Sequence, residues 1–181
     1  MRFALLLAAL ATFGTPAAAS PYPTQYDRPI KVAASKWLPG VPWQLLKAQY
    51  YQESKLNPDA VSPVGAAGIA QFMPATWREV AGELQLGAVD RRLAAPAIEA
   101  GAYYMMKQRR FWRALADWGR HDHAMASYNA GAGNIRKAWT LCRQPAEWAG
   151  TAPCLPLVTK HHAKETTTYV ARIWRWFAAM L

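Results

Sequence analysis

The sequence predicts a mainly α-helical protein with a single domain, and three observations support this. Apolar residues recur at three- and four-residue spacings in several segments, and no segment shows the sustained alternation typical of β-strands. The chain has 181 residues, 52% of them hydrophobic, which is enough for one compact core but not for a second full-sized domain. Charged residues make up 18% and aromatic residues 12%, which excludes disordered, collagen-like and coiled-coil chains.

Residues 1–19 have the pattern of a signal peptide. Arg2 supplies a positive start, an apolar stretch runs from Phe3 to Phe13, and residues 17–19 are small, as a cleavage site requires. A retained membrane anchor is the alternative, but this stretch spans only about half of a hydrocarbon core about 30 Å thick. No cysteine lies nearby to carry a lipid. We therefore expect an exported protein, periplasmic or secreted, with no stable membrane span after signal removal.

The elements after the signal peptide follow from proline positions and apolar spacing. Pro21 and Pro23 indicate an extended lead-in over residues 20–37, before a domain at 38–181. Pro42 and Pro74 suit the first turns of helices. Asn57-Pro58 stops the first of these, and Ser62-Pro63 with the glycines at 65 and 68 indicates an irregular segment before Pro74. The expected helices cover residues 42–53, 74–84, 97–111, 123–129, 134–141 and 164–180.

The chain is strongly basic, with a net charge of +10. In an exported protein this favours an acidic wall polymer or an anionic membrane surface as partner, and not nucleic acid. The densest run of cations is interpreted as a solvated helix face; it consists of Lys107, Arg109, Arg110, Arg113 and Arg120. The last helix is amphipathic, and we expect it to pack on the core, with a membrane surface as the alternative.

The two cysteines, Cys142 and Cys154, are expected to form a disulfide in an oxidising compartment, with buried free thiols as the alternative. No metal or cofactor is predicted, since the chain has no phosphate-binding glycine loop and too few cysteines for a Cys-rich zinc site. The histidine pairs at 121 and 123 and at 161 and 162 are interpreted as surface residues, the first pair lying before a helix.

Glu53, at the end of the expected 42–53 helix, begins a series of short motifs. An isolated glutamate on a helix is usually a solvated charge. Here it is followed by Ser54, Asn57-Pro58, Ser62, Gly65-Ala66-Ala67-Gly68 and Gln71-Phe72-Met73-Pro74, and later by Ser127-Tyr128-Asn129-Ala130-Gly131 and Glu165-Thr166 with Tyr169-Val170. In this order the motifs resemble the catalytic domain of the family 1 (soluble-type, SLT domain) lytic transglycosylases over about residues 38–179.

The resemblance implies a lysozyme-like domain whose central helix ends at the catalytic Glu53. It also implies cleavage of the bond between N-acetylmuramic acid and N-acetylglucosamine in peptidoglycan glycan strands. The implied substrate-binding residues are Ser62, Gln71, Met73, Tyr128, Asn129, Glu165 and Tyr169. Of these, Tyr128 is expected to steady the acid or the cationic sugar, while Glu165 and Tyr169 would close the groove from the far side.

The number of available carboxylates bears on the mechanism. Common glycosidases use two, but Asp59, Glu79 and Glu83 lie outside the matched motifs. We therefore predict that Glu53 acts first as acid and then as base, so that the muramic acid's own 6-hydroxyl attacks and a 1,6-anhydro end forms. The first step requires a raised Glu53 pKa, expected from desolvation.

Other functions stay open at this point. A hydrolytic muramidase of the same fold would leave reducing ends, while a non-catalytic peptidoglycan-binding module or a cationic membrane-active polypeptide would not need Glu53. The sequence also leaves open whether the protein remodels the wall generally, serves a phage, or works with a secretion or conjugation apparatus.

Overall fold

The computed structural model describes residues 21–181, so the predicted signal peptide lies outside the described part of the chain. Within residues 21–181 the chain is helical and has no β-strand, only isolated bridges in the segment between the second and third helices. The helices are α1 (Asp27–Trp37), α2 (Trp43–Ser54), α3 (Pro74–Glu83), α4 (Ala94–Phe111), α5 (Asp117–Ala130), α6 (Ala132–Leu141), α7 (Trp148–Thr151), α8 (Pro156–Thr159) and α9 (Ala163–Ala179), with 3-10 turns η1 (Ala152–Cys154) and η2 (Lys160–His162). The predicted mainly α fold is confirmed.

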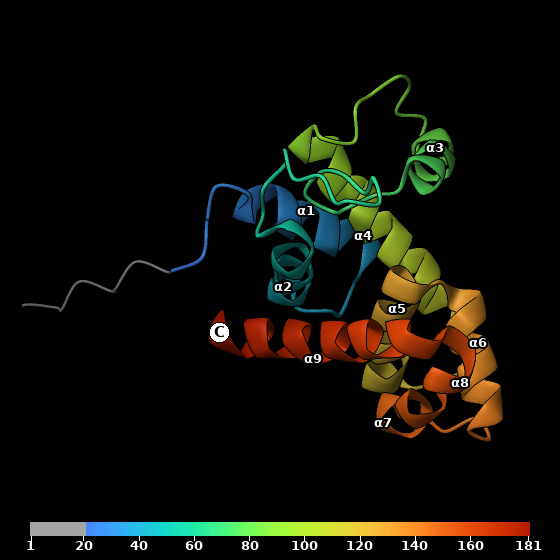
Figure 1. The fold of residues 1–181 in the computed structure, drawn as a ribbon. Coiled ribbons are helices and arrows are strands. Elements are labelled where there is room, and N and C mark those ends of the chain that lie inside the picture. The colour runs from blue at the N-terminus through green and yellow to red at the C-terminus, as the bar shows by residue number, and fades with distance from the viewer. Residues whose placement is uncertain (1–20) are drawn as a thin grey trace, which may run out of the picture.

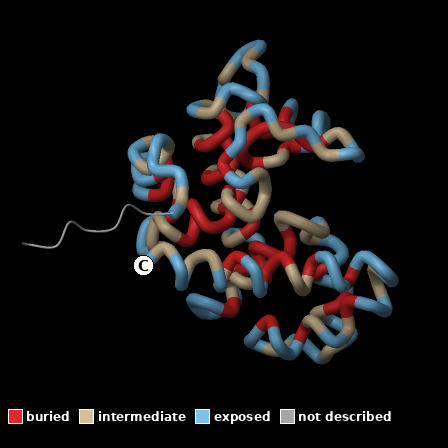
Figure 2. The backbone as a smooth tube through the Cα atoms, turned by 60° about the vertical axis from the view of Figure 1, so that its left-hand side comes forward, coloured by how far each residue is buried: buried red, intermediate tan, exposed pale blue. Residues whose placement is uncertain are grey.

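Helix α2 is the central element. Every residue from Leu45 to Tyr50 is buried, so this helix has no solvent-facing stripe along its middle, as expected for a helix surrounded by others. Figure 1 shows α9 crossing beside α2, with α1 and α4 on the other side of it. Figure 2 shows buried residues along the inner sides of the helices and exposed residues on the outer turns. This arrangement directs the end of α2 into the junction with α9.

The prediction of an extended lead-in over residues 20–37 was wrong for most of that segment. Residues Asp27–Trp37 form α1, which packs against α4 and α2. Ile30, Ala33 and Ala34 are buried at helical spacing. Pro29 lies in the first turn, where a proline is tolerated because its missing N–H would have no partner inside the helix. The domain therefore begins before residue 38.

The histidines at 121 and 123 were also misplaced as surface residues. Helix α5 begins at Asp117, six residues earlier than predicted, and both rings are buried within it. Arg109 Nη1 lies 2.8 Å from His121 Nδ1. Burial and this guanidinium lower the pKa of His121 to about 3, so the ring is neutral and accepts the arginine hydrogen bond. His161 and His162 are exposed, as predicted.

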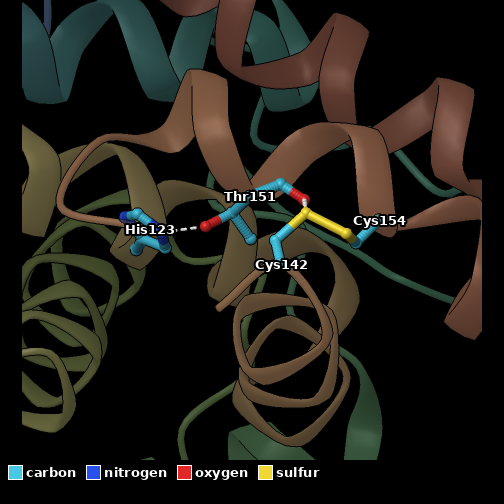
Figure 3. Close-up of a disulfide and its surroundings, with 4 residues drawn as sticks. All are labelled: His123, Cys142, Thr151 and Cys154. Atoms are coloured by element: carbon cyan, nitrogen blue, oxygen red, sulfur yellow. Dashed lines mark hydrogen bonds between the residues drawn. A yellow bond between two sulfur atoms is a disulfide. The ribbon is translucent and has the colours of Figure 1, made fainter. Parts of the chain in front are cut away.

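A disulfide braces the region after α6. Cys142 and Cys154 are joined, with their Cα atoms 5.8 Å apart, so neither sulfur is a free thiol. Figure 3 shows the bridge beside Thr151, whose hydroxyl lies 2.7 Å from His123 Nε2. Nδ1 of the same ring lies 2.6 Å from the Gly119 carbonyl oxygen. The disulfide and the buried histidine together tie α7 and η1 to α5 and α6.

Helix α9 packs on the core. Its residues Tyr169, Val170 and Ile173 are buried, and it lies against both α2 and α5. The face that membrane contact would require is therefore covered by protein. None of the helices in residues 21–181 combines the length and apolar character needed to cross a bilayer.

Candidate active site

Glu53 lies in the last turn of α2, where the chain makes a sharp change of direction. Lys55 and Leu56 have φ angles of 58° and 63°, the left-handed conformation that ends the helix. Ser54 Oγ donates a hydrogen bond to the Ile69 carbonyl oxygen at 2.9 Å, which fastens the following segment against the end of the helix. Glu53 thus points into the site, and Ser54 anchors the loop that follows α2 beside it.

The segment after α2 is a compact irregular loop. Gly68 has a φ of +83°, and a Cβ at this position would lie 2.2 Å from the Arg91 carbonyl oxygen, so only glycine fits. Ala67 bridges both Val61 and Phe72, which brings the two ends of the loop together. Close packing explains the small residues at 66–68, whereas Gly65 has open space around it and is favoured by its φ of +85°.

Glu53 accepts a hydrogen bond from the facing helix α9. Tyr169 Oη donates to Glu53 Oε1 at 2.5 Å, and Gln49 Nε2 donates to the same tyrosine oxygen at 3.3 Å. Gln49 precedes Glu53 by one helical turn, so the two residues that hydrogen-bond to the Tyr169 hydroxyl both come from α2. Tyr169 therefore contacts the acid itself, a closer role than closing the groove.

The pKa of Glu53 is raised to about 8, mainly by burial; the Tyr169 hydrogen bond lowers it, and the negative charge of Glu165 makes a smaller raising contribution. The Glu53 side chain as a whole is half-buried. Tyr50, Tyr128 and Tyr169 surround it, and burial together with the Glu53 charge raises the pKa of each phenol well above its ordinary value. At neutral pH Glu53 is therefore mostly protonated, which is the state that a general acid needs.

Tyr128 supports the site from α5. Its Oη donates a hydrogen bond to the Ala70 carbonyl oxygen at 2.9 Å, and its ring packs against Tyr104 with centroids 5.1 Å apart. This hydrogen bond holds the loop that carries Ser62, Gln71 and Met73. It does not contact Glu53 itself. Tyr128 still lies close enough to Glu53 for the two to interact electrostatically, because the Glu53 charge raises the pKa of Tyr128.

Asn129 and Glu165 lie next to each other at a surface pocket. Asn129 Nδ2 donates to Glu165 Oε1 at 3.3 Å, and Thr166 Oγ1 donates to Asn129 Oδ1 at 2.8 Å. All three residues line a pocket of about 420 Å³, whose other walls come from α6 and from residues 158–162 of α8 and η2. Since the Glu165 charge acts on Glu53, this pocket lies within electrostatic reach of the acid. It offers amide, carboxylate and hydroxyl groups to a polar ligand.

The loop residues Ser62 and Gln71 form hydrogen bonds within the loop. Ser62 Oγ accepts from the Ala66 amide at 2.9 Å, and Gln71 Nε2 donates to the carbonyl oxygens of Ala60 at 3.1 Å and Gly68 at 2.9 Å. Met73 directly precedes α3 and is 42% exposed. The Ser62 hydroxyl proton and the side-chain oxygen of Gln71 (Oε1) can still bind a ligand, since neither is used in these hydrogen bonds.

The other carboxylates considered from the sequence lie elsewhere. Glu79 and Glu83 both pair with Lys107, at 2.7 and 2.8 Å. Asp59 is exposed, and none of the three contributes to the pKa shift of Glu53. Glu165 is the second acid at the site, one that the sequence had assigned to substrate binding. Within residues 21–181 no group of histidine, cysteine, aspartate and glutamate side chains has the arrangement of a metal site.

Comparison with known families identifies the domain. A family model described as "Transglycosylase SLT domain" matches residues 30–149, most of the described chain. The chain belongs to this family. The match begins inside α1, which supports an earlier start of the domain than the sequence had predicted.

Several relatives of this SLT domain are known. It is similar to "Membrane-bound lytic murein transglycosylase F" of Shewanella pealeana, with 31% identity over 139 residues, covering 74% of this chain and 28% of the relative. The protein of the same name from Desulfosudis oleivorans is 33% identical over 135 residues, covering 72% and 28%. The crystal structure of the 70 kDa soluble lytic transglycosylase Slt70 from Escherichia coli superposes with a TM-score of 0.69 and 25% identity, covering 88% of this chain and 24% of that one.

The SLT domain described here thus spans less than a third of the length of these relatives. The predicted resemblance to the family and the predicted fold are confirmed. Three residues that organise the site had no site role assigned from the sequence: Gln49, and also Ser54 and Thr166, which belonged to the quoted motifs. Gln49 carried a usable signal, because it lies among the apolar residues Leu45, Leu46 and Tyr50, one turn before Glu53, and a polar residue on an apolar helix face needs a buried partner.

Proposed function

We propose that the protein is a peptidoglycan lytic transglycosylase that cleaves the β-1,4 bond between N-acetylmuramic acid and N-acetylglucosamine without consuming water. The observation that carries this proposal is Glu53, a carboxyl group with a pKa of about 8 that accepts a hydrogen bond from Tyr169. An acid that stays protonated at neutral pH, beside groups able to bind sugars, is suited to protonate a glycosidic oxygen.

In the first step the Glu53 carboxyl group donates its proton to the glycosidic oxygen, and the bond from that oxygen to C1 of the muramic acid breaks. The electron pair of the broken bond leaves with the N-acetylglucosamine, which departs as an alcohol. The muramic acid is left as an oxocarbenium-like cation, and Glu53 as a carboxylate. Tyr169 stabilises that carboxylate through its hydrogen bond.

In the second step the 6-hydroxyl oxygen of the same muramic acid attacks C1. The hydroxyl proton passes to the Glu53 carboxylate, which restores the acid for the next cycle, and the product carries a 1,6-anhydro ring. One carboxyl group thus serves as acid and then as base. Asn129 and Glu165 are proposed to hold the sugar hydroxyl and amide groups at the neighbouring pocket, with Ser62, Gln71 and Met73 on the loop side.

A hydrolytic muramidase is the second candidate, because Glu165 supplies another carboxylate within electrostatic reach of Glu53. A hydrolase would use it to activate water or to stabilise the cation. Glu165 is exposed and accepts a hydrogen bond from Asn129, which favours a role in binding. The two reactions differ in their product, since hydrolysis adds one water to the muramic acid end.

Digestion of purified sacculi, followed by mass spectrometry of the released muropeptides, tests the proposal. We expect 1,6-anhydro ends from the wild-type protein and none from Glu53→Gln. Glu99→Gln is the matched control, since Glu99 lies on α4 in an exposed pair with Lys36. Reducing ends instead of anhydro ends would establish the muramidase, and release of nothing by folded wild-type protein would indicate a binding module.

Export to the cell wall belongs to the same proposal. The curated relatives are lytic murein transglycosylases by name, and the Cys142–Cys154 disulfide is consistent with an oxidising compartment. Mass determination of protein recovered from a periplasmic fraction tests cleavage after residue 19. Association with a secretion or conjugation apparatus stays a prediction, and its test is co-purification of such components from the cell envelope.

A further inference from the structure

Three cations gather on the surface where the end of α2 meets the second half of α9. Lys55, Arg172 and Arg175, together with the aromatic rings of Tyr51 and Trp176 on which Lys55 and Arg175 lie, are called the basic ledge here. Lys55 Nζ lies 4.4 Å from the Tyr51 ring centroid and 4.6 Å from that of Trp176. The Arg175 guanidinium carbon lies 4.7 Å from the same Trp176 centroid. These distances are within the range of cation–π attraction.

The positive charges of the ledge are not neutralised by the protein. Lys55, Arg172 and Arg175 are all exposed, and none forms an ion pair with an acid in residues 21–181. The pKa of Lys55 is lowered, first by its partial burial and then by the two arginine charges. Like charges held close together repel each other, so an anion that binds between them gains from all three charges.

The aromatic base of the ledge is fixed in place. Trp176 Nε1 donates a hydrogen bond to Gln52 Oε1 at 3.1 Å, and its ring meets Tyr51 edge-on with centroids 5.1 Å apart. Because Lys55 and Arg175 already lie over Trp176, this indole supports cations rather than offering a bare face to a sugar. The ledge is therefore suited to a ligand that is anionic rather than merely carbohydrate.

The ledge adjoins the acid along both helices. Lys55 follows Glu53 by two residues, and on α9 Arg172 and Trp176 follow Tyr169 on the same face of the helix. At about 1.5 Å per residue, Tyr169 and Trp176 are about 10 Å apart along the axis. An extended peptide spans about 3.3 Å per residue, so about three residues cover this distance.

We propose that the basic ledge is a subsite for the carboxylates of the stem peptide attached to the muramic acid whose bond is cut. This rests on the proposed function, which places that muramic acid beside Glu53. The peptide begins at the lactyl group of that sugar, and its free carboxylates lie two or three residues along. Charge-assisted hydrogen bonds to Arg172, Arg175 and Lys55 would bind them.

An anionic membrane surface is the competing ligand for a basic patch. Membrane-surface helices bury a continuous apolar face in the lipid. In α9 the apolar residues Tyr169, Val170 and Ile173 are buried, and Trp174, Trp176 and Phe177 are half-buried against the core. The ledge therefore has exposed charge but no continuous exposed apolar face beside it. The geometry therefore favours a soluble anionic group that is held close to the acid.

The test compares two substrates of the purified protein, namely glycan strands that carry stem peptides and the same strands stripped by an N-acetylmuramoyl-L-alanine amidase. The variant is Arg172→Gln/Arg175→Gln, and the matched control is Arg113→Gln/Lys137→Gln, which removes two exposed cations elsewhere. We expect the ratio of kcat/KM on peptide-bearing strands to that on stripped strands to fall about tenfold or more in the ledge variant. The control should keep the wild-type ratio.

An unchanged ratio in the folded ledge variant overturns the subsite while leaving the proposed function intact. Cleavage of neither substrate by wild-type protein overturns both. Should the double variant fail to fold, Arg172→Gln alone, at an exposed position, takes its place with a smaller drop in the same ratio. Loss of sedimentation with phosphatidylglycerol and phosphatidylethanolamine vesicles, at an unchanged substrate ratio, would assign the ledge to membranes instead.

Discussion

Helix α9 donates an aromatic hydrogen bond to each of two carboxyl groups on other helices. Tyr169 Oη donates to Glu53 at 2.5 Å, and Trp174 Nε1 donates to Asp122 at 2.7 Å. Burial raises the pKa of both acids, of Glu53 to about 8 and of Asp122 to about 6, and in both the aromatic donor acts against that shift. Judged by burial and hydrogen bonding alone, the two sites are alike.

Their surroundings differ. Glu53 lies within electrostatic reach of Glu165 and of the pocket that Asn129 and Thr166 line. Asp122 also has a second acid within electrostatic reach, Glu147, but its hydrogen-bond donor Trp174 packs against another aromatic ring, that of Trp118. A raised pKa shows that an acid is shielded from water. It indicates a catalytic role only where other polar groups surround a space for the substrate.

The largest effect we expect separates these two acids by their contribution to rate. Glu53→Gln removes the proton that the first step needs and should lower kcat by about 10² to 10⁴-fold. Asp122→Asn, a change of the same size, should leave kcat within a few-fold. Initial rates of muropeptide release by both folded variants measure this. A comparable loss in Asp122→Asn would contradict the assignment of the acid.

A second comparison concerns the region around Cys142 and Cys154, which we expect to matter for stability rather than for rate. Replacing both cysteines by alanine opens a short loop and should lower the free energy of unfolding by about 3 kcal/mol in the chain-entropy estimate. Denaturant unfolding of wild type and double variant measures this, with kcat at low temperature as the control. A collapse of kcat in a variant that stays folded would show that the brace also shapes the site.

Parts of the fold and the site followed from local signals in the sequence. The spacing around Leu45 and Leu46 predicted α2 nearly to the residue, and the motifs after Glu53 identified the family. Helix α1 was missed because Pro21 and Pro23 indicated an extended segment. Ile30, Ala33 and Ala34, which follow them, nevertheless have helical spacing. Local propensity is a weak guide where packing against a distant helix stabilises an element.

Contacts between distant segments were out of reach for the same physical reason. The sequence drew attention to the dense cation run after residue 106, yet Lys107 there pairs with two glutamates and Arg109 binds His121. The basic ledge instead joins Lys55 to Arg172, which lie far apart in the chain. Composition shows that charge is present, and only the fold decides which charges are neutralised.

The two acids should also be distinguishable by the pH dependence of stability. Each keeps its proton in the folded chain at pH values where the unfolded chain has lost it, so each makes the free energy of unfolding fall as pH rises, by at most about 1.4 kcal/mol per pH unit. For Asp122 this window lies between about pH 4 and 6, and for Glu53 it extends from about pH 4.5 to 8.

Buried His121 and His123, whose pKa values are lowered by burial, act with the opposite sign below pH 6.5. Differences between wild type and variant remove this shared background. We expect Glu53→Gln to remove the fall between pH 6 and 8, and Asp122→Asn to remove only a fall below pH 6. Urea unfolding across the pH range measures both, and identical windows for the two variants would contradict the proposed pKa values.

The smallest expected effect concerns the two aromatic donors on α9. The proposed first step requires a protonated Glu53, so activity should decline above about pH 8. Tyr169→Phe removes a hydrogen bond that stabilises the carboxylate, so the pKa of Glu53 should rise and the alkaline limb of kcat/KM should move upward by up to about one pH unit. Trp174→Phe acts on Asp122 and should leave the limb in place. An alkaline limb that stays fixed in Tyr169→Phe, or moves with Trp174→Phe, would mean that a group other than Glu53 controls the rate.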